Sequence, residues 1–132
     1  MSDTTRHWTP VHLPTDCAPP AGPYSPAVRT GELLFVSGQV PRDPRTGDTV
    51  GADVRQQARR TLENLGMVLA AAGAAPNDVV SVTVYLADEN DWSAFNEVYR
   101  EFFRPPYPSR TVVGAQLRGI LVEVSAVARI PG

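Results

Sequence analysis

Residues 53–73 read DVRQQARRTLENLGMVLAAAG, and they carry the clearest periodic pattern in the chain. Apolar residues recur three and four positions apart, which predicts a helix over 53–72 with one apolar stripe. The stripe consists of Val54, Ala58, Leu62, Leu65, Leu69 and Ala72. We expect Asp53 to cap the start of this helix, with Gln56 completing a capping-box pattern, and Gly73 to cap its end.

The segments that flank this helix predict strands. Leu33 to Ser37 is a short apolar run between two glycines, which is typical of a strand buried on both faces. After the helix, residues 79–87 alternate in the manner of a half-buried strand. One side of this strand is expected to carry Val80, Val82, Val84 and Leu86, and the other side Ser81, Thr83 and Tyr85.

Prolines and other turn formers mark the irregular parts of the chain. Eight of the 13 prolines fall in the first 44 residues, so we expect residues 10–26 to be extended and irregular. Residues 7–12 are expected to form an edge strand. Residues 41–47, PRDPRTG, are dense in turn formers and predict a surface loop.

A second helix is expected from Trp92 to about Phe103. Asp91 can cap its start, and Pro105-Pro106 end it because proline cannot continue a helix. Its apolar stripe consists of Trp92, Phe95, Tyr99 and Phe102.

Two strands close the chain, 110–116 and 120–129, and we expect them to pair as a hairpin through a short turn at Arg118-Gly119. The order of elements is therefore strands, helix, strand, helix and two strands. Right-handed crossovers place both helices on the same face of a mixed sheet, which predicts an α+β two-layer sandwich. The length favours a single domain over 1–132, with 1–17 as an N-terminal extension or edge strand.

Two helices cover only one face of such a sheet. The other face is expected to carry Val79, Tyr85, Leu121 and Val127 among its polar residues. An apolar surface of this kind is normally covered, and self-association is the simplest way to cover it.

Missing residue types exclude several kinds of chemistry. All 12 basic residues are arginine, so the chain has no lysine for a Schiff base or a Walker-type phosphate loop. Cys17 is the only cysteine, which excludes a disulfide framework and a zinc knuckle. The only histidines, His7 and His12, leave no histidine-based triad in the body of the chain. We expect no metal and no cofactor.

The net charge and the hydropathy of the chain limit the kinds of partner that we expect it to bind. The 12 basic and 14 acidic residues give a net charge of −2 with no clustered basic surplus, so no nucleic acid is expected. No apolar run reaches the roughly 20 residues that a membrane span needs, so no membrane partner is expected. A lone cysteine fits a reducing environment, and the expected location is cytoplasmic.

Two charged residues stand out as candidates for chemistry. Glu123 lies mid-strand between two valines; if it is buried, its charge must be paired or its pKa raised, and either state suits a group that activates water. The alternative is a glutamate on a wet face of the sheet. Arg110 follows a rigid proline-rich segment and offers a planar fork for a carboxylate, the alternative being a surface arginine on an edge strand. The predicted hairpin places the two on neighbouring strands.

The remaining candidates lie on loops, at a strand end and on the second helix. Tyr24, in a proline-stiffened loop, is expected to line a pocket mouth or to lie on its own loop. Ser37 and Gly38 end the first long strand, where glycine permits close approach of a ligand or simply ends the strand. Asn96 lies beside aromatic residues, and Cys17 is expected to be inert because nothing nearby promotes its thiolate.

Several short motifs occur in one order along the chain. The first half contributes GPYS at 22–25, VSGQVP at 36–41, DPRTG at 43–47 and the helical segment 58–73. The second half contributes FNEVY at 95–99, FF at 102–103, PSRTV at 108–112 and VEVSAVA at 122–128. Each motif is weak alone, but together, from about residue 18 to 129, they resemble the Rid family of reactive intermediate deaminases, also called YjgF-type proteins.

The resemblance implies a chorismate-mutase-like fold and a homotrimer with sites in the clefts between subunits. It implies a cofactor-independent hydrolase of the 2-iminobutanoate/2-iminopropanoate deaminase type, acting on species such as 2-aminoacrylate and releasing a 2-keto acid and ammonia. Arg110 would grip the substrate carboxylate and Glu123 would hold the attacking water. The substrate-binding surface would consist of Tyr24, Ser37, Gly38, Asn96 and the backbone near Val112, where a cysteine is frequent in the family.

Two other hypotheses stay open. The chain could be a pathway-specific relative that acts on another imine or enamine in biosynthesis or catabolism, or a non-catalytic trimer that binds a small carboxylate. An endoribonuclease role, attached to some names in the family, is disfavoured by the net acidic charge and the absence of lysine.

Overall fold

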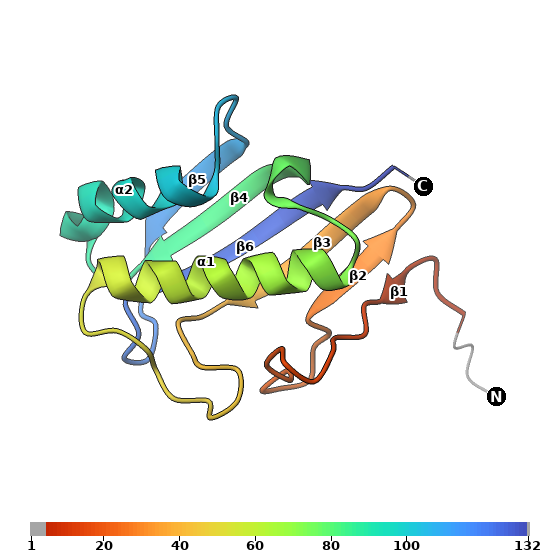
Figure 1. The fold of residues 1–132 in the computed structure, drawn as a ribbon, viewed down its shortest axis with the longest axis horizontal. Helices are drawn as coiled ribbons and strands as arrows, with labels where there is room; N and C mark the ends of the chain where they lie inside the picture. The colour runs from red at the N-terminus through yellow and green to blue at the C-terminus, as the bar shows by residue number, and fades with distance from the viewer. Residues whose placement is uncertain (1–4, 132) are drawn as a thin grey trace.

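The computed structural model describes residues 5–131 and folds them as a mixed β-sheet with two α-helices on one face (Figure 1). The strands are β1 (Thr9–Pro10), β2 (Ala27–Thr30), β3 (Leu33–Gln39), β4 (Val79–Leu86), β5 (Ser109–Gly114) and β6 (Val122–Arg129). The helices are α1 (Val54–Ala71) and α2 (Trp92–Phe102), with short 3-10 helices η1 (Pro76–Asp78) and η2 (Glu89–Asp91). The predicted α+β two-layer fold is confirmed.

The sheet order is β1-β2-β3-β6-β4-β5, and β4 and β5 are its parallel pair within the described residues. Figure 1 shows α1 crossing in front of β3 and β6, with α2 beside it on the same face of the sheet. The core lies between these two layers, because the apolar stripes of the helices pack on one face of the strands.

The long helix forms much as its sequence predicts. The Asp53 carboxylate accepts a hydrogen bond from the backbone N–H of Gln56 at 2.9 Å. The Gln56 side chain reaches back to the N–H of Ala52 at 2.7 Å, one residue earlier than in a capping box. Gly73 follows the helix with a φ of +80°, a conformation that glycine adopts without strain. At α2, by contrast, Asp91 makes no capping bond with its side chain.

The expectation that residues 33–37 are buried on both faces is wrong for the single chain. Leu34 and Val36 are buried, but Leu33 and Phe35 are 40% and 42% exposed on the face away from the helices. The run is continuously apolar, yet its side chains alternate between the two faces, and only one face is covered. These exposed apolar groups agree with the bare sheet face that the element order predicts.

The start of β4 also departs from the predicted alternation. A register shift in its pairing with β6 lies between Val79 and Ser81. The extra residue of such a bulge shifts the alternation by one, so the residues before it point to the opposite face from the one predicted. Val79 is therefore buried under the helices and Val80 is 48% exposed. Val79 therefore belongs to the core rather than to the bare face, where Tyr85 and Val127 do lie. Leu121 precedes β6 and packs partly against the core.

The predicted closing hairpin is wrong. β5 pairs in parallel with β4, while β6 lies between β3 and β4 and pairs antiparallel with both. Residues 115–121 carry the chain from the edge strand β5 past β4 to the centre of the sheet. The physical reason is burial: β6 buries Val122, Val124, Ala126 and Ala128, whereas β5 has a mostly exposed sequence that suits an edge.

The N-terminal region is irregular, as expected. The edge strand is shorter than the predicted 7–12, since β1 spans only Thr9–Pro10 beside β2. No helix or strand forms between β1 and β2, and residues 41–47 form the predicted surface loop.

Candidate active site

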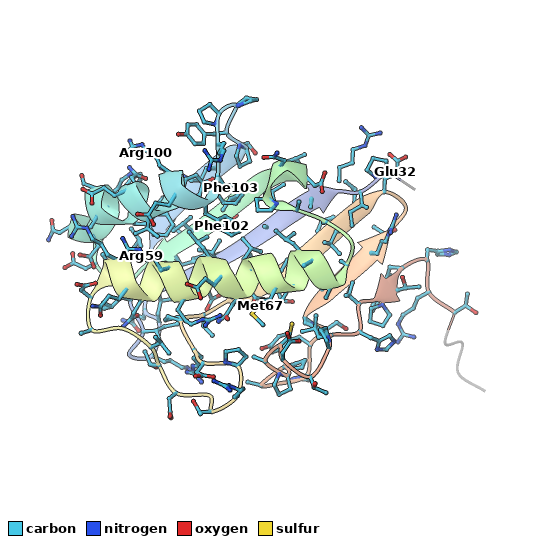
Figure 2. The ribbon with its side chains drawn as sticks, in the orientation of Figure 1. Glu32, Arg59, Met67, Arg100, Phe102 and Phe103 are labelled. Atoms are coloured by element: carbon cyan, nitrogen blue, oxygen red, sulfur yellow. The ribbon has the colours of Figure 1, made fainter. Side chains whose placement is uncertain are left out.

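A cavity of about 780 Å³ lies where β3 ends, between α1, the segment around residues 17–26 and the loop 40–47. Four of the predicted site residues line it: Tyr24, Ser37, Gly38 and Glu123. We call it the Glu123 cavity. Met67 lines it from α1, and Figure 2 shows Met67 on the side of the helix that faces these loops.

The Glu123 carboxylate packs directly over Gly38. A Cβ atom built on Gly38 would overlap Oε2 of Glu123 and lie 2.8 Å from its Cδ. Only glycine at position 38 lets another group come this close to the backbone, and that group is the Glu123 carboxylate rather than a ligand. Glu123 alternates with buried Val122 and Val124, so it projects to the face away from the helices. Within residues 5–131 it has no ion-pair or hydrogen-bond partner, which leaves both oxygens free to accept.

Ser37 ties the floor of this cavity to the loop that carries Tyr24. Its hydroxyl donates to the carbonyl of Ser25 at 2.6 Å, and its N–H donates to the carbonyl of Pro26 at 3.0 Å. The Tyr24 hydroxyl accepts from the N–H of Ala21 at 3.2 Å, so this residue lies on its own loop while it also lines the cavity mouth. Tyr24 therefore lies on its own loop and lines the cavity at the same time, although the sequence presented these as alternatives.

A second cavity, of about 280 Å³, holds the other charged candidate. It is lined by Asn96, Tyr99, Arg100, Tyr107, Pro108 and Arg110, and we call it the Arg110 cavity. Nη1 of Arg110 donates to Oδ1 of Asn96 at 2.8 Å. The centre of the guanidinium lies 4.7 Å from the centroid of the Tyr99 ring, within cation–π range. Among the described residues no carboxylate forms an ion pair with Arg110.

Tyr99 is the residue that sequence reasoning missed as part of a site. It belongs to the apolar stripe of α2, and it is buried with 4% exposure. Burial raises the pKa of its phenol to about 12, although the nearby Arg110 charge acts in the opposite direction. The available signal was its spacing, because a residue three positions after Asn96 lies on the same side of a helix.

The two charged candidates do not meet within one chain. Arg110 is the register partner of Val82, and Glu123 is the partner of Tyr85, so β4 lies between them. Val82 and Tyr85 are three positions apart on β4, and this odd spacing places the side chains of Arg110 and Glu123 on opposite faces of the sheet. Strand spacing and rise put their Cα atoms about 14 Å apart. The predicted neighbouring positions of Arg110 and Glu123 are therefore wrong.

The other candidates lie outside this pairing. Val112 shares the face of Arg110 on β5, packs partly against the core, and lines neither cavity. Cys17 is buried beside the Glu123 cavity. Burial raises the pKa of its thiol, and the nearby charge of Asp16 raises it further, which agrees with its predicted inertness.

Between residues 5 and 131, no cluster of three His, Cys, Asp or Glu side chains is placed to hold a metal. Neither α1 nor α2 combines the length and apolarity that crossing a membrane requires.

Known proteins share both this sequence and this fold. Residues 15–130 match the family described as Endoribonuclease L-PSP. A RutC family protein of Pyrococcus horikoshii is 46% identical over 117 residues, covering 86% of this chain and 93% of that protein. The 2-iminobutanoate/2-iminopropanoate deaminase of Mus musculus is 44% identical over 119 residues, covering 88% of each. The crystal structure of E. coli TdcF with bound serine is 35% identical with a TM-score of 0.84, covering 92% of this chain and 98% of that one. The chain therefore belongs to the Endoribonuclease L-PSP family, which is the Rid or YjgF-type family that its motifs resemble.

Proposed function

We propose that the protein is a cofactor-independent deaminase that hydrolyses a reactive enamine or imine, such as 2-aminoacrylate or 2-iminopropionate, to a 2-keto acid and ammonia. The observation that carries this proposal is a matched pair of unpaired charges. Arg110 and Glu123 each line a cavity, and neither has an ion-pair partner in residues 5–131. The name of the Mus musculus relative supports the same activity.

The proposed chemistry uses one cation and one carboxylate. The planar Arg110 fork donates hydrogen bonds to the carboxylate of the substrate and fixes its orientation. The enamine 2-aminoacrylate first becomes its imine tautomer, by gaining a proton at its terminal carbon and losing one from nitrogen. Glu123 then accepts a proton from a water molecule as the water oxygen bonds to the imine carbon, and passes that proton to the nitrogen. The resulting carbinolamine transfers its hydroxyl proton to the nitrogen as the C–N bond breaks, which releases ammonia and leaves the 2-keto acid.

The opposite placement of these residues supports a site shared between copies of the chain. A second copy that covers the bare sheet face can bring its Arg110 cavity against the Glu123 cavity of the first. That face exposes Leu33, Phe35 and Val113 at 40%, 42% and 40%. Contacts between two different surfaces form a ring when the rotation from copy to copy closes, and the family resemblance supports a ring of three subunits.

A mixing experiment tests the shared site. Arg110→Ala and Glu123→Gln are purified separately, each with strongly reduced hydrolysis of 2-aminoacrylate generated by a coupled enzyme. The two proteins are then unfolded together in equal amounts and refolded. In a ring of three, every mixed trimer regains one site with both residues intact, so random mixing restores about a quarter of the wild-type activity.

The controls separate the outcomes of this mixing. Each variant refolded alone reports its own residual activity, and light scattering reports three chain masses for all samples. No recovery on mixing would show that the site is not shared between chains in this way, and would overturn the shared site. Arg110→Ala with wild-type activity would overturn the proposed site.

Two observations favour the other candidate functions. The Glu123 cavity, about 780 Å³, lies within the range of about 300–1,000 Å³ that holds drug-sized ligands, which favours a pathway-specific relative with a larger imine substrate. The bound serine in the TdcF structure favours a trimer that binds a small carboxylate without catalysis. A panel of imines made from different amino acids, with 2-oxobutanoate binding measured in parallel, separates these candidates from the main proposal.

We further propose that the protein does not act on RNA and works in the cytoplasm. The net charge of −2 and the absence of lysine supply no strong phosphate-binding surface. Tight RNA binding that persists at high salt would contradict the first part. Fractionation of cells that produce the protein tests the second.

A further inference from the structure

Arg110 is held by two side chains from the same helix. Asn96 accepts its Nη1 hydrogen bond at 2.8 Å, and the ring centroid of Tyr99 lies 4.7 Å from the guanidinium carbon. Asn96 and Tyr99 are three residues apart on α2, so both face β5 from one side of the helix. We propose that Tyr99 is a positioning residue, which presents its ring as a platform for Arg110 while Asn96 fixes the rotation of the guanidinium. This inference rests on the proposed role of Arg110 in binding the substrate carboxylate.

The geometry leaves the rest of the guanidinium available. An arginine side chain carries five N–H donors in one plane, and Asn96 uses one nitrogen of that plane. The aromatic ring covers one face of the plane and offers no competing acceptor in it. A carboxylate approaching in the plane therefore meets an oriented fork rather than a mobile one, and less side-chain entropy is lost on binding.

The ring is itself rigidly packed. Its centroid lies 4.7 Å from Phe103, 5.8 Å from Phe95 and 6.4 Å from Tyr107. Its hydroxyl is buried and finds no hydrogen-bond partner among the described residues. The hydroxyl therefore makes no contact that positions Arg110, and we assign the positioning role to the face of the ring.

Two substitutions at Tyr99 separate the ring from the hydroxyl. Tyr99→Leu removes the cation–π contact and should raise the KM for the imine substrate about three- to thirty-fold, with a smaller change in kcat. Tyr99→Phe keeps the ring and should rescue most of that loss. Phe102→Leu is the matched control, because Phe102 lies on the same helix and its ring packs against Phe103 (Figure 2). It also points toward Gly66 on α1, whereas the ring over Arg110 is that of Tyr99.

A second readout does not depend on catalysis. The Nε–H signal of Arg110 in a proton–nitrogen NMR spectrum, identified by its absence in Arg110→Lys, should be shifted by the ring current of Tyr99. The shift should disappear in Tyr99→Leu and persist in Tyr99→Phe and Phe102→Leu. The affinity for 2-oxobutanoate should follow the same order as the KM.

The outcomes distinguish this inference from the proposed function. If Arg110→Ala abolishes activity but Tyr99→Leu behaves as Phe102→Leu in KM and in the NMR signal, the positioning role is wrong and the deaminase site stands. If Tyr99→Phe loses as much as Tyr99→Leu, the hydroxyl is responsible and the inference is overturned. If the wild type hydrolyses no imine, the deaminase proposal fails, while the Arg110 signal and the 2-oxobutanoate affinity still test the positioning role.

Discussion

The Glu123 cavity and the Arg110 cavity place a charged group in opposite ways. Glu123 projects from the inner strand β6 into a cavity walled largely by loops, and it is accommodated by the missing side chain of Gly38, with no polar partner of its own in the described chain. Arg110 sits between a strand and a helix and is held by an amide oxygen and an aromatic ring. Under the proposed roles, the comparison teaches that the carboxylate meant to accept a proton is left without a partner, whereas the arginine meant to orient a ligand is fixed in advance.

The largest expected effect comes from Glu123→Gln. The amide keeps the shape of the side chain but cannot accept a proton from water, so kcat should fall by about 10²- to 10⁴-fold. Binding of 2-oxobutanoate, measured by calorimetry, should remain near that of the wild type. An equal loss of binding would instead assign Glu123 to holding the ligand and would remove the contrast between the cavities.

Arg110→Lys should act on binding. Lysine offers a point charge and loses the second parallel hydrogen bond, so kcat/KM should fall about ten- to a hundred-fold, mainly through KM. Steady-state kinetics measure this split. The control is Arg104→Lys, an exposed arginine outside both cavities, which should leave the kinetics unchanged. A fall confined to kcat would place Arg110 in the chemical step.

Gly38→Ala should sharpen the description of the Glu123 cavity. A Cβ there displaces the carboxylate, and a shift of this size should lower kcat about ten-fold with little change in stability, since the side chain can move. Gly114→Ala is the matched control, because its Cβ would also meet a carboxylate, Oε1 of Glu89 at 3.0 Å, away from both cavities. Equal kinetics for the two variants would show that the position of the Glu123 carboxylate is unimportant.

The smallest effect concerns the Arg110 cavity at alkaline pH. Burial raises the pKa of Tyr99 from an ordinary value near 10 to about 12. The folded state therefore favours the neutral phenol, and this contribution to stability is complete below about pH 10 and is lost as the pH rises toward 12. A near-ultraviolet titration of the folded protein should show one late step near pH 12 that is missing in Tyr99→Phe. Persistence of that step in the variant would assign it to another tyrosine.

Several parts of the fold follow from local sequence. The apolar stripe and caps of residues 53–73 predict α1 to within one residue at each end. The aromatic spacing predicts α2, and the segments around β3, β4 and β6 are recognised as strands. Each of these features depends on residues that lie within a few positions of one another, so the sequence alone is enough to predict it.

The candidate site follows from sequence only in part. The sequence indicates the mid-strand carboxylate of Glu123 and the glycine at position 38 as candidates, and the structure brings them into contact. Arg110 and Asn96 were also singled out, yet their hydrogen bond joins an edge strand to a helix and has no local signal. The sequence predicts only a core position for Tyr99, because an aromatic residue in an apolar stripe gives no indication that its ring also contacts a cation.

The sequence by itself therefore determined the two helices and four of the six strands in residues 5–131, β3, β4, β5 and β6, but not β2 (Ala27–Thr30). It also determined that one sheet face would be bare and which charged residues are unusual. Only the tertiary structure decided that β6 inserts between β3 and β4, and that Arg110 and Glu123 lie on opposite faces of the sheet. The physical reason is that alternation along a strand records which side chains share a face but not which strand lies beside it. That choice depends on burial summed over the whole sheet, in which the strand with the most buried side chains takes the centre and the exposed one takes the edge.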